Sequence, residues 1–271
     1  MAASRNADEK YFNLLMEPLR VCAKYKPMFG QGRNGGMNLA QFQQMYRADP
    51  FYNWMGLDSP LMYAAHKAAG GMTSIYRQIG IGCQWIFQAM LRDNLALDEV
   101  QVNWSYNVPK ADGEERTLSL DGRIDLEHVH DPAGKKRVAT WLADAMARAE
   151  VPKESRDKIK GAVFEVRQGY KSKDSKRQNA DIANASNAYA HLYVPVVLLL
   201  STQIDSGIAD RYALARWLLL IGSTSGKATE STYTFCRDVV GYDLAAFFER
   251  NSGRIKAELE AILQKLLEAS P

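Results

Sequence analysis

Asp125 and Glu165 are the two acidic side chains whose settings in this sequence indicate chemistry. Asp125 lies in Gly122–Val129, where alternating apolar and polar residues predict a β-strand, and Glu165 lies inside the apolar strand predicted for Ala162–Gln168. Two carboxylates on neighbouring strands offer the oxygen ligands that a hard divalent cation prefers, and such a cation can activate water against a phosphodiester. We therefore expect Asp125 and Glu165 to be catalytic and to bind a hard divalent cation.

A structural ion pair is the alternative explanation for Glu165. A charged side chain inside an apolar strand is unfavourable unless it has partners. Strand alternation places Arg123 on the face that carries Asp125, and Arg167 on the face that carries Glu165. Either arginine could neutralise Glu165 without any metal.

A basic tract follows the second strand directly. The run from Lys153 to Arg177 holds nine Lys or Arg against four Asp or Glu. Lysines at the start of a helix add phosphate contacts to the amides and dipole of the helix N-terminus, although such a run can also be a solvated face. The expected DNA-binding side chains are Arg33, Lys171, Lys173, Lys176, Arg177, Gln178 and Asn179.

The elements that would position these side chains change in type along the chain. Residues 1–95 have mostly helical patterns, residues 96–201 contain the predicted strands, and residues 202–271 are again mostly helical. This order indicates an α/β (α+β) fold in which helices flank a central mixed β-sheet, with helical N- and C-terminal additions. No repeat or linker divides the chain, so we expect a single domain.

Two glycine-containing signals mark expected boundaries. Asp121-Gly122 is typical of a two-residue hairpin, which predicts that the strand ending at Leu120 turns back into the strand that begins at Gly122. Gly70-Gly71 predicts a break between two helices, the second running from Thr73 to about Asn94.

The bulk composition constrains partners and location. The 271 residues have a net charge of +3, so nucleic-acid binding must depend on local clusters of charge. Three distant cysteines without a CxxC motif argue against a disulfide framework and indicate a reducing, cytoplasmic location. The longest apolar runs are too short to span a membrane, so no membrane partner is expected.

The order of these motifs resembles the PD-(D/E)XK nuclease superfamily and, within it, the type II restriction endonucleases. G-R-I-D at Gly122–Asp125 is similar to the first acidic motif, and E-V-R at Glu165–Arg167 is similar to the second. The helix predicted for Ser175–His191 and the apolar strand Val194–Leu200 match the elements that follow the motif. The resemblance covers about Thr73 to Ser201.

The resemblance implies a restriction-endonuclease-like fold and a bacterial or archaeal homodimer that cuts double-stranded DNA at a specific site with Mg²⁺. It also implies that Arg167, Lys171 and Lys173 assist catalysis and that Gln84 supports the metal site. Two residues depart from the pattern, because Arg167 stands where Lys is usual and Gln84 where Glu is common. Arginine stabilises charge but is a poor proton acceptor, so Lys171 or Lys173 could take the lysine's place.

Two other functions fit the same residues. One is a repair or defence nuclease of the same superfamily that recognises DNA structure rather than sequence. The other is a catalytically degenerate DNA-binding module, which Arg167 and Gln84 both favour.

Overall fold

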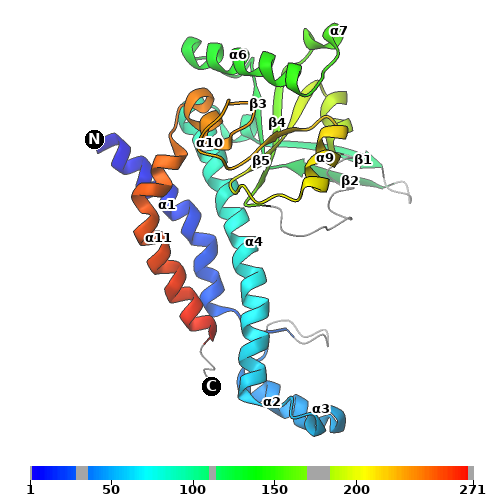
Figure 1. The fold of residues 1–271 in the computed structure, drawn as a ribbon, viewed down its shortest axis with the longest axis vertical. Helices are drawn as coiled ribbons and strands as arrows, with labels where there is room; N and C mark the ends of the chain where they lie inside the picture. The colour runs from blue at the N-terminus through cyan, green and yellow to red at the C-terminus, as the bar shows by residue number, and fades with distance from the viewer. Residues whose placement is uncertain (1, 29–35, 110–113, 170–183, 268–271) are drawn as a thin grey trace. The chain divides into compact units, whose positions relative to one another are not determined.

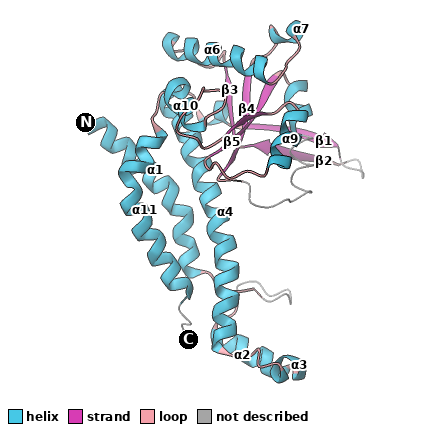
Figure 2. Cartoon of the chain, in the orientation of Figure 1, coloured by secondary structure: helices cyan, strands magenta, loops and turns pink. Residues whose placement is uncertain are grey.

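The computed structural model describes residues 2–28, 36–109, 114–169 and 184–267. It is a mixed α/β structure, as the sequence predicted (Figures 1 and 2). The described strands form two β-sheets, one of them mixed, where the sequence predicted a single central sheet. The strands are β1 (Trp104–Pro109), β2 (Glu115–Leu120), β3 (Gly122–Asp125), β4 (Gly161–Arg167), β5 (Tyr193–Leu199) and β6 (Leu218–Leu220). None of the described helices is both long and apolar enough to cross a bilayer.

The described helices differ widely in length. The longer helices are α1 (Ala2–Arg20), α2 (Leu39–Ala48), α4 (Pro60–Leu95), α6 (Pro132–Arg148), α9 (Ser206–Leu214) and α11 (Leu244–Leu267). The short helical elements are η1 (Val21–Lys24), α3 (Pro50–Trp54), α5 (Glu99–Val102), α7 (Lys153–Arg156), α10 (Thr232–Phe235) and η2 (Cys236–Val240). Residues 184–190 are also helical, so the end of the helix predicted for Ser175–His191 is confirmed, and its start lies outside the described residues.

The chain divides into two compact units, residues 1–82 with 250–271 and residues 83–249. Residues 83–95 and 202–249, whose sequence patterns are mostly helical, belong to the same unit as the strands. In the first unit, α1 and α11 lie side by side (Figure 1). Three ion pairs join these two helices: Arg250 with Asp8 at 2.7 Å, Arg254 with Glu9 at 2.8 Å, and Arg20 with Glu258 at 3.0 Å.

The predicted helix break at Gly70-Gly71 is wrong, because α4 continues through both glycines. A Cβ atom on Gly70 would lie 2.0 Å from the Tyr25 hydroxyl oxygen, and one on Gly71 would lie 2.8 Å from the Leu266 side chain. The glycines therefore allow close packing inside the first unit. This packing offsets the roughly 1 kcal/mol that glycine loses relative to alanine in a helix.

The second unit contains both sheets. In the four-stranded sheet, the order is β3-β4-β5-β6, with β3 antiparallel to β4 and the other two pairs parallel. Strands β1 and β2 form a separate antiparallel pair. The hairpin predicted at Asp121-Gly122 is therefore wrong: β2 and β3 do not pair, and the chain passes at Asp121 from one sheet into the other.

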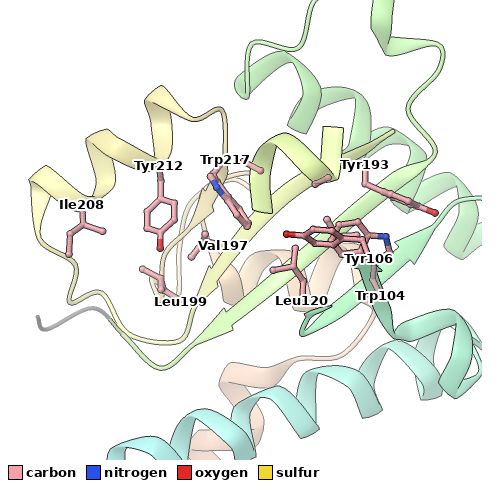
Figure 3. Close-up of a cluster of buried hydrophobic side chains, with 12 residues drawn as sticks. Trp104, Tyr106, Leu120, Tyr193, Val197, Leu199, Ile208, Tyr212 and Trp217 are labelled. Atoms are coloured by element: carbon pink, nitrogen blue, oxygen red, sulfur yellow. The ribbon is translucent and has the colours of Figure 1, made fainter. Parts of the chain in front are cut away.

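Apolar side chains cover both faces of the four-stranded sheet. On one face, the Phe164 ring of β4 lies 5.0 Å from Phe87 of α4 and 5.5 Å from Phe235 of α10. The other face carries a cluster built from the β1–β2 pair, residues 184–190 and α9, which includes Trp104, Tyr106, Tyr193 and Trp217 (Figure 3). Any charged side chain on this second face must therefore find partners within a mostly apolar layer.

Candidate functional site

Asp121 lies just before β3, next to the part of β4 that holds Glu165. The register of β3 and β4 begins with the pair of Gly122 and Phe164, and Glu165 follows Phe164 directly on β4. Two hydrogen bonds fix Asp121 here: its amide donates to the Phe164 carbonyl at 2.7 Å, and its Oδ2 accepts from the Val166 amide at 2.8 Å.

Arg167 completes this end of the strand pair. It lies two residues beyond Glu165 on β4, and strand alternation therefore places it on the same face. Its Nη2 lies 2.7 Å from Oε1 of Glu165, and the two side chains are only 9% and 12% exposed. One of the two expected ion pairs is thus present. We call Asp121, Glu165 and Arg167 the acidic–arginine cluster.

Asp125 lies at the other end of β3, opposite Gly161, and the structure does not bring it to Glu165. Glu165 lies four residues further along β4 than Gly161, which corresponds to about 13 Å along a strand. Both carboxylate oxygens of Asp125 already accept hydrogen bonds, Oδ2 from the Tyr193 hydroxyl at 2.7 Å and Oδ1 from the Glu127 amide at 3.0 Å. The structure thus does not bring together the two acids that the sequence expected to share a metal. Asp121 is the aspartate that is hydrogen-bonded to the residues on either side of Glu165.

The contact between Asp125 and Tyr193 depends on Gly161. In the register, Asp125, Gly161 and Tyr193 form a row across three strands, and Tyr193 reaches over the glycine to Asp125. A Cβ atom on Gly161 would lie 1.9 Å from the Ile124 carbonyl oxygen, so only glycine fits. Burial and the neighbouring Asp125 carboxylate raise the pKa of Tyr193 to about 12. This row is a buried structural contact.

Arg123 lies between these two ends of β3. The sequence offered it as a partner for Glu165, and in the structure its guanidinium contacts α5. Its guanidinium donates to the Gln101 carbonyl at 2.9 Å and to the Val100 carbonyl at 3.0 Å, both in α5. Cations at the last turn of a helix stabilise its unsatisfied carbonyl groups. Arg123 therefore holds α5 against β3.

Helix α4 supports the backbone at Asp121. The Gln88 side chain donates to the Asp121 carbonyl at 2.9 Å and to the Asn103 side chain at 3.4 Å. Gln84 lies one turn earlier on the same face of α4, because residues four apart are neighbours on a helix. Gln84 is thus on the side of α4 that approaches the acidic–arginine cluster.

The donor chemistry of this cluster fits a small hard cation. Among the described residues, no group of three or more His, Cys, Asp or Glu side chains could hold a metal ion. Mg²⁺, however, is commonly bound by one or two carboxylates, with waters and substrate phosphates completing its shell. Asp121 and Glu165 supply two such carboxylates, while Arg167 offsets part of their negative charge.

The expected basic side chains cannot be placed. Arg33, Lys171, Lys173, Lys176, Arg177, Gln178 and Asn179 lie outside the described residues. The first described residues after β4, Gln168 and Gly169, lead directly from Arg167 into this stretch of sequence. What connects the basic tract to the cluster is therefore its position in the sequence, directly after β4.

Sequence reasoning missed Asp121 because it assigned this residue to a turn. Alternation extended one step upstream of Gly122 would have put Asp121 on the face of Arg123 and Asp125. The choice between the two aspartates requires the pairing register, which the sequence pattern does not contain.

No protein-family model, curated protein or solved structure matches the chain.

Proposed function

We propose that this protein is a Mg²⁺-dependent endonuclease of double-stranded DNA, with a restriction-endonuclease-like core, and that it cuts at specific sites as type II enzymes do. The observation that carries the proposal is that Asp121 is hydrogen-bonded to Phe164 and Val166, the residues on either side of Glu165, while Arg167 pairs with Glu165. The mixed sheet and the basic tract after β4 agree with it.

Each residue of the cluster has a proposed role. Asp121 and Glu165 would hold the cation through carboxylate oxygens. A bound divalent cation would supply Lewis-acid stabilisation of phosphate charge and lower the pKa of water. Arg167 stays protonated at any working pH, so it would stabilise negative charge on the phosphate and would not accept a proton. Lys171 or Lys173 would then assist the attacking water.

Double-strand cleavage at a symmetric site adds a requirement on assembly. One acidic–arginine cluster can cut one strand, so two copies related by a two-fold axis would cut both strands of the duplex. The proposed enzyme is therefore a homodimer bound to double-stranded DNA.

A second candidate function is DNA binding without cleavage. The observation that favours it is the buried pair of Glu165 and Arg167, because a guanidinium at 2.7 Å already neutralises the glutamate. In that case the pair would be structural, and the basic tract alone would contact phosphates. Such binding would weaken steeply with salt, since each phosphate contact releases a counterion.

Plasmid digestion in Mg²⁺ separates these functions. The wild-type chain should cut, whereas Asp121→Asn and Glu165→Gln should lower the rate at least ~100-fold, as removal of a single charge-stabilising group does in other enzymes. Asp125→Asn is the matched control, because the amide oxygen can still accept from Tyr193, and it should keep wild-type cleavage.

The cleavage products and the salt dependence of DNA binding distinguish the remaining candidate functions. Discrete fragments with one end sequence indicate site-specific cleavage, and cutting only at branches or damage indicates a structure-specific nuclease. Salt-sensitive binding without cleavage by the wild-type chain would support the DNA-binding module instead. Full cleavage by both Asp121→Asn and Glu165→Gln would contradict the proposed site.

A further inference from the structure

An exposed apolar surface lies in the first unit, on α3 and at the start of α4. Among the described residues, twelve large apolar side chains are exposed, and five of them fall between positions 51 and 61. These five, which we call the α3 apolar surface, are Phe51, Tyr52, Trp54, Met55 and Leu61, at 60%, 40%, 81%, 61% and 80% exposed. The density of the group distinguishes it from single exposed apolar residues, which are common.

Local structure holds this surface in place. Phe51, Trp54 and Met55 are spaced as i, i+3 and i+4, so they lie on one side of α3. Asp49 caps the helix by accepting from the amides of Phe51 at 3.0 Å and Tyr52 at 3.2 Å. The side chains are therefore presented by a capped helix.

Aromatic stacking joins α3 to the nearby core. The Tyr52 ring stacks on Tyr46 of α2 at 4.9 Å, and Tyr46 packs on Phe42 at 4.2 Å. Phe42, Tyr46 and Tyr63 form a small buried cluster of their own. One side of α3 is therefore packed against this cluster. The other side is apolar and is exposed in the described structure.

The exposed area approaches what a dimer interface uses. At roughly 150–250 Å² for a large side chain, the five exposed fractions together offer on the order of 600 Å² of apolar surface. A standard protein interface buries about 800 Å² on each partner, with a polar rim around its apolar centre. Aromatic side chains such as Trp54 and Phe51 are also the type that dominates binding energy in such centres.

The charged residues near this surface indicate which kind of partner it can bind. Residues 48–65 contain two aspartates, Asp49 and Asp58, and no Lys, Arg or His. Asp49 serves as the helix cap, and Asp58 lies 2.8 Å from Arg47. Nucleic acid and anionic lipid both require cations at the contact, and this segment supplies none. Arg47, which directly precedes this segment, is exposed but is paired with Asp58. An apolar surface with no cation of its own is complementary to another apolar surface.

We propose that two copies of this chain associate through the α3 apolar surface, in an isologous contact where the same side chains meet across a two-fold axis. The inference rests on exposure, area and charge in the first unit, and it does not depend on the nuclease proposal. If both hold, the contact supplies the pair of cutting sites that double-strand cleavage requires.

Analytical ultracentrifugation of the full chain at micromolar concentrations tests the contact. The wild-type protein should sediment as a dimer, whereas Trp54→Asp and Leu61→Asp should be monomeric at the same concentration. Leu214→Asp and Val100→Asp are matched controls, because these side chains are 86% and 78% exposed elsewhere in the chain, and both should stay dimeric. A monomeric wild-type chain, or dimers that persist in both surface variants, would overturn the proposal.

A second measurement guards against misfolded variants. Circular dichroism spectra should match among all five proteins. Subtracting the fluorescence of Trp54→Phe from that of wild type isolates the emission of Trp54, which should shift to shorter wavelength as protein concentration rises. A Trp54 signal that stays solvent-exposed at every concentration would overturn the contact, even if another surface makes a dimer. A wild-type monomer that binds anionic vesicles or duplex DNA through Trp54 would also overturn it and would assign the surface to that ligand. Because mass and fluorescence do not require cleavage, a failed nuclease assay would leave this test unaffected.

Discussion

An aspartate lies at each end of β3, yet the settings of the two differ. At one end, Asp125 is buried and hydrogen-bonded to a tyrosine across a glycine. At the other, Asp121 is hydrogen-bonded to the two residues that flank Glu165, and the Glu165 carboxylate contacts an arginine. A neutral hydrogen-bond donor gives Asp125 a structural role, whereas clustered acids give Asp121 a setting in which a cation is favourable. The partners therefore distinguish the two aspartates, while their spacing and strand do not.

The largest stability effect expected from this comparison is at the arginine end. Arg167→Ala removes the cation 2.7 Å from Glu165 in a setting where both side chains are little exposed. Breaking a buried ion pair costs about 3–5 kcal/mol of unfolding free energy. Urea denaturation measures this difference.

An exposed pair provides the matched control for that measurement. Arg237 lies 2.7 Å from Asp238, and both side chains are about half exposed. Arg237→Ala should change the unfolding free energy by no more than about 1 kcal/mol. Equal effects of the two substitutions would show that the Glu165–Arg167 pair is not specially sensitive to burial.

Asp125→Ala should give a smaller loss of stability without altering the acidic–arginine cluster. The substitution leaves the buried Tyr193 hydroxyl without its acceptor, which costs about 1–3 kcal/mol. Asp125→Asn keeps an acceptor and should be milder. Thermal unfolding measures the change, and a loss of cation binding at unchanged stability would contradict the structural role assigned to Asp125.

Alkaline pH should weaken the Asp125 end selectively. Because the folded pKa of Tyr193 is raised from 10.0 to about 12, the folded protein keeps this proton when the unfolded chain has lost it. Its stabilising contribution is therefore complete below pH 10 and declines as pH rises toward 12. Tyr193→Phe should reduce the decline of stability across this window, and an unchanged pH profile in the variant would argue against a raised pKa.

Gln84→Glu should have the smallest effect, at the Asp121 end. The change adds a carboxylate on the side of α4 that approaches the cluster, one turn from the contact between Gln88 and Asp121. A third acid near two others should strengthen divalent-cation binding severalfold, since hard cations prefer more oxygen ligands. Titration of wild type and variant with Mn²⁺ measures the change; weaker binding would place Gln84 away from the cluster.

Alternation and composition predicted the elements better than the contacts between them. Strands β4 and β5 are apolar enough to be recognised, and a lone Glu165 within β4 identified a position that needs a partner. The register could not be predicted, because the Asp121-Gly122 signal has the same form whether the chain turns back or crosses between sheets. That one choice is why Asp125, and not Asp121, is the acid that the sequence predicts.

Glycines caused the other main error. Gly70-Gly71 was interpreted as a helix break, since glycine weakens helices, but its missing side chain instead admits Tyr25 and Leu266. Gly161 acts in the same way where the backbone of Ile124 and Asp125 approaches it. Such close approaches depend on residues distant in sequence and are therefore absent from any local pattern.

Cation binding by matched aspartate variants tests the central claim most directly. Electron paramagnetic resonance of Mn²⁺, with Mg²⁺ as competitor, measures the bound ion without requiring cleavage. Wild type and Asp125→Asn should bind Mn²⁺ equally, whereas Asp121→Asn and Glu165→Gln should lose that binding. Retained binding in Asp121→Asn together with lost binding in Asp125→Asn would contradict the account and return the site to the other end of the strand pair.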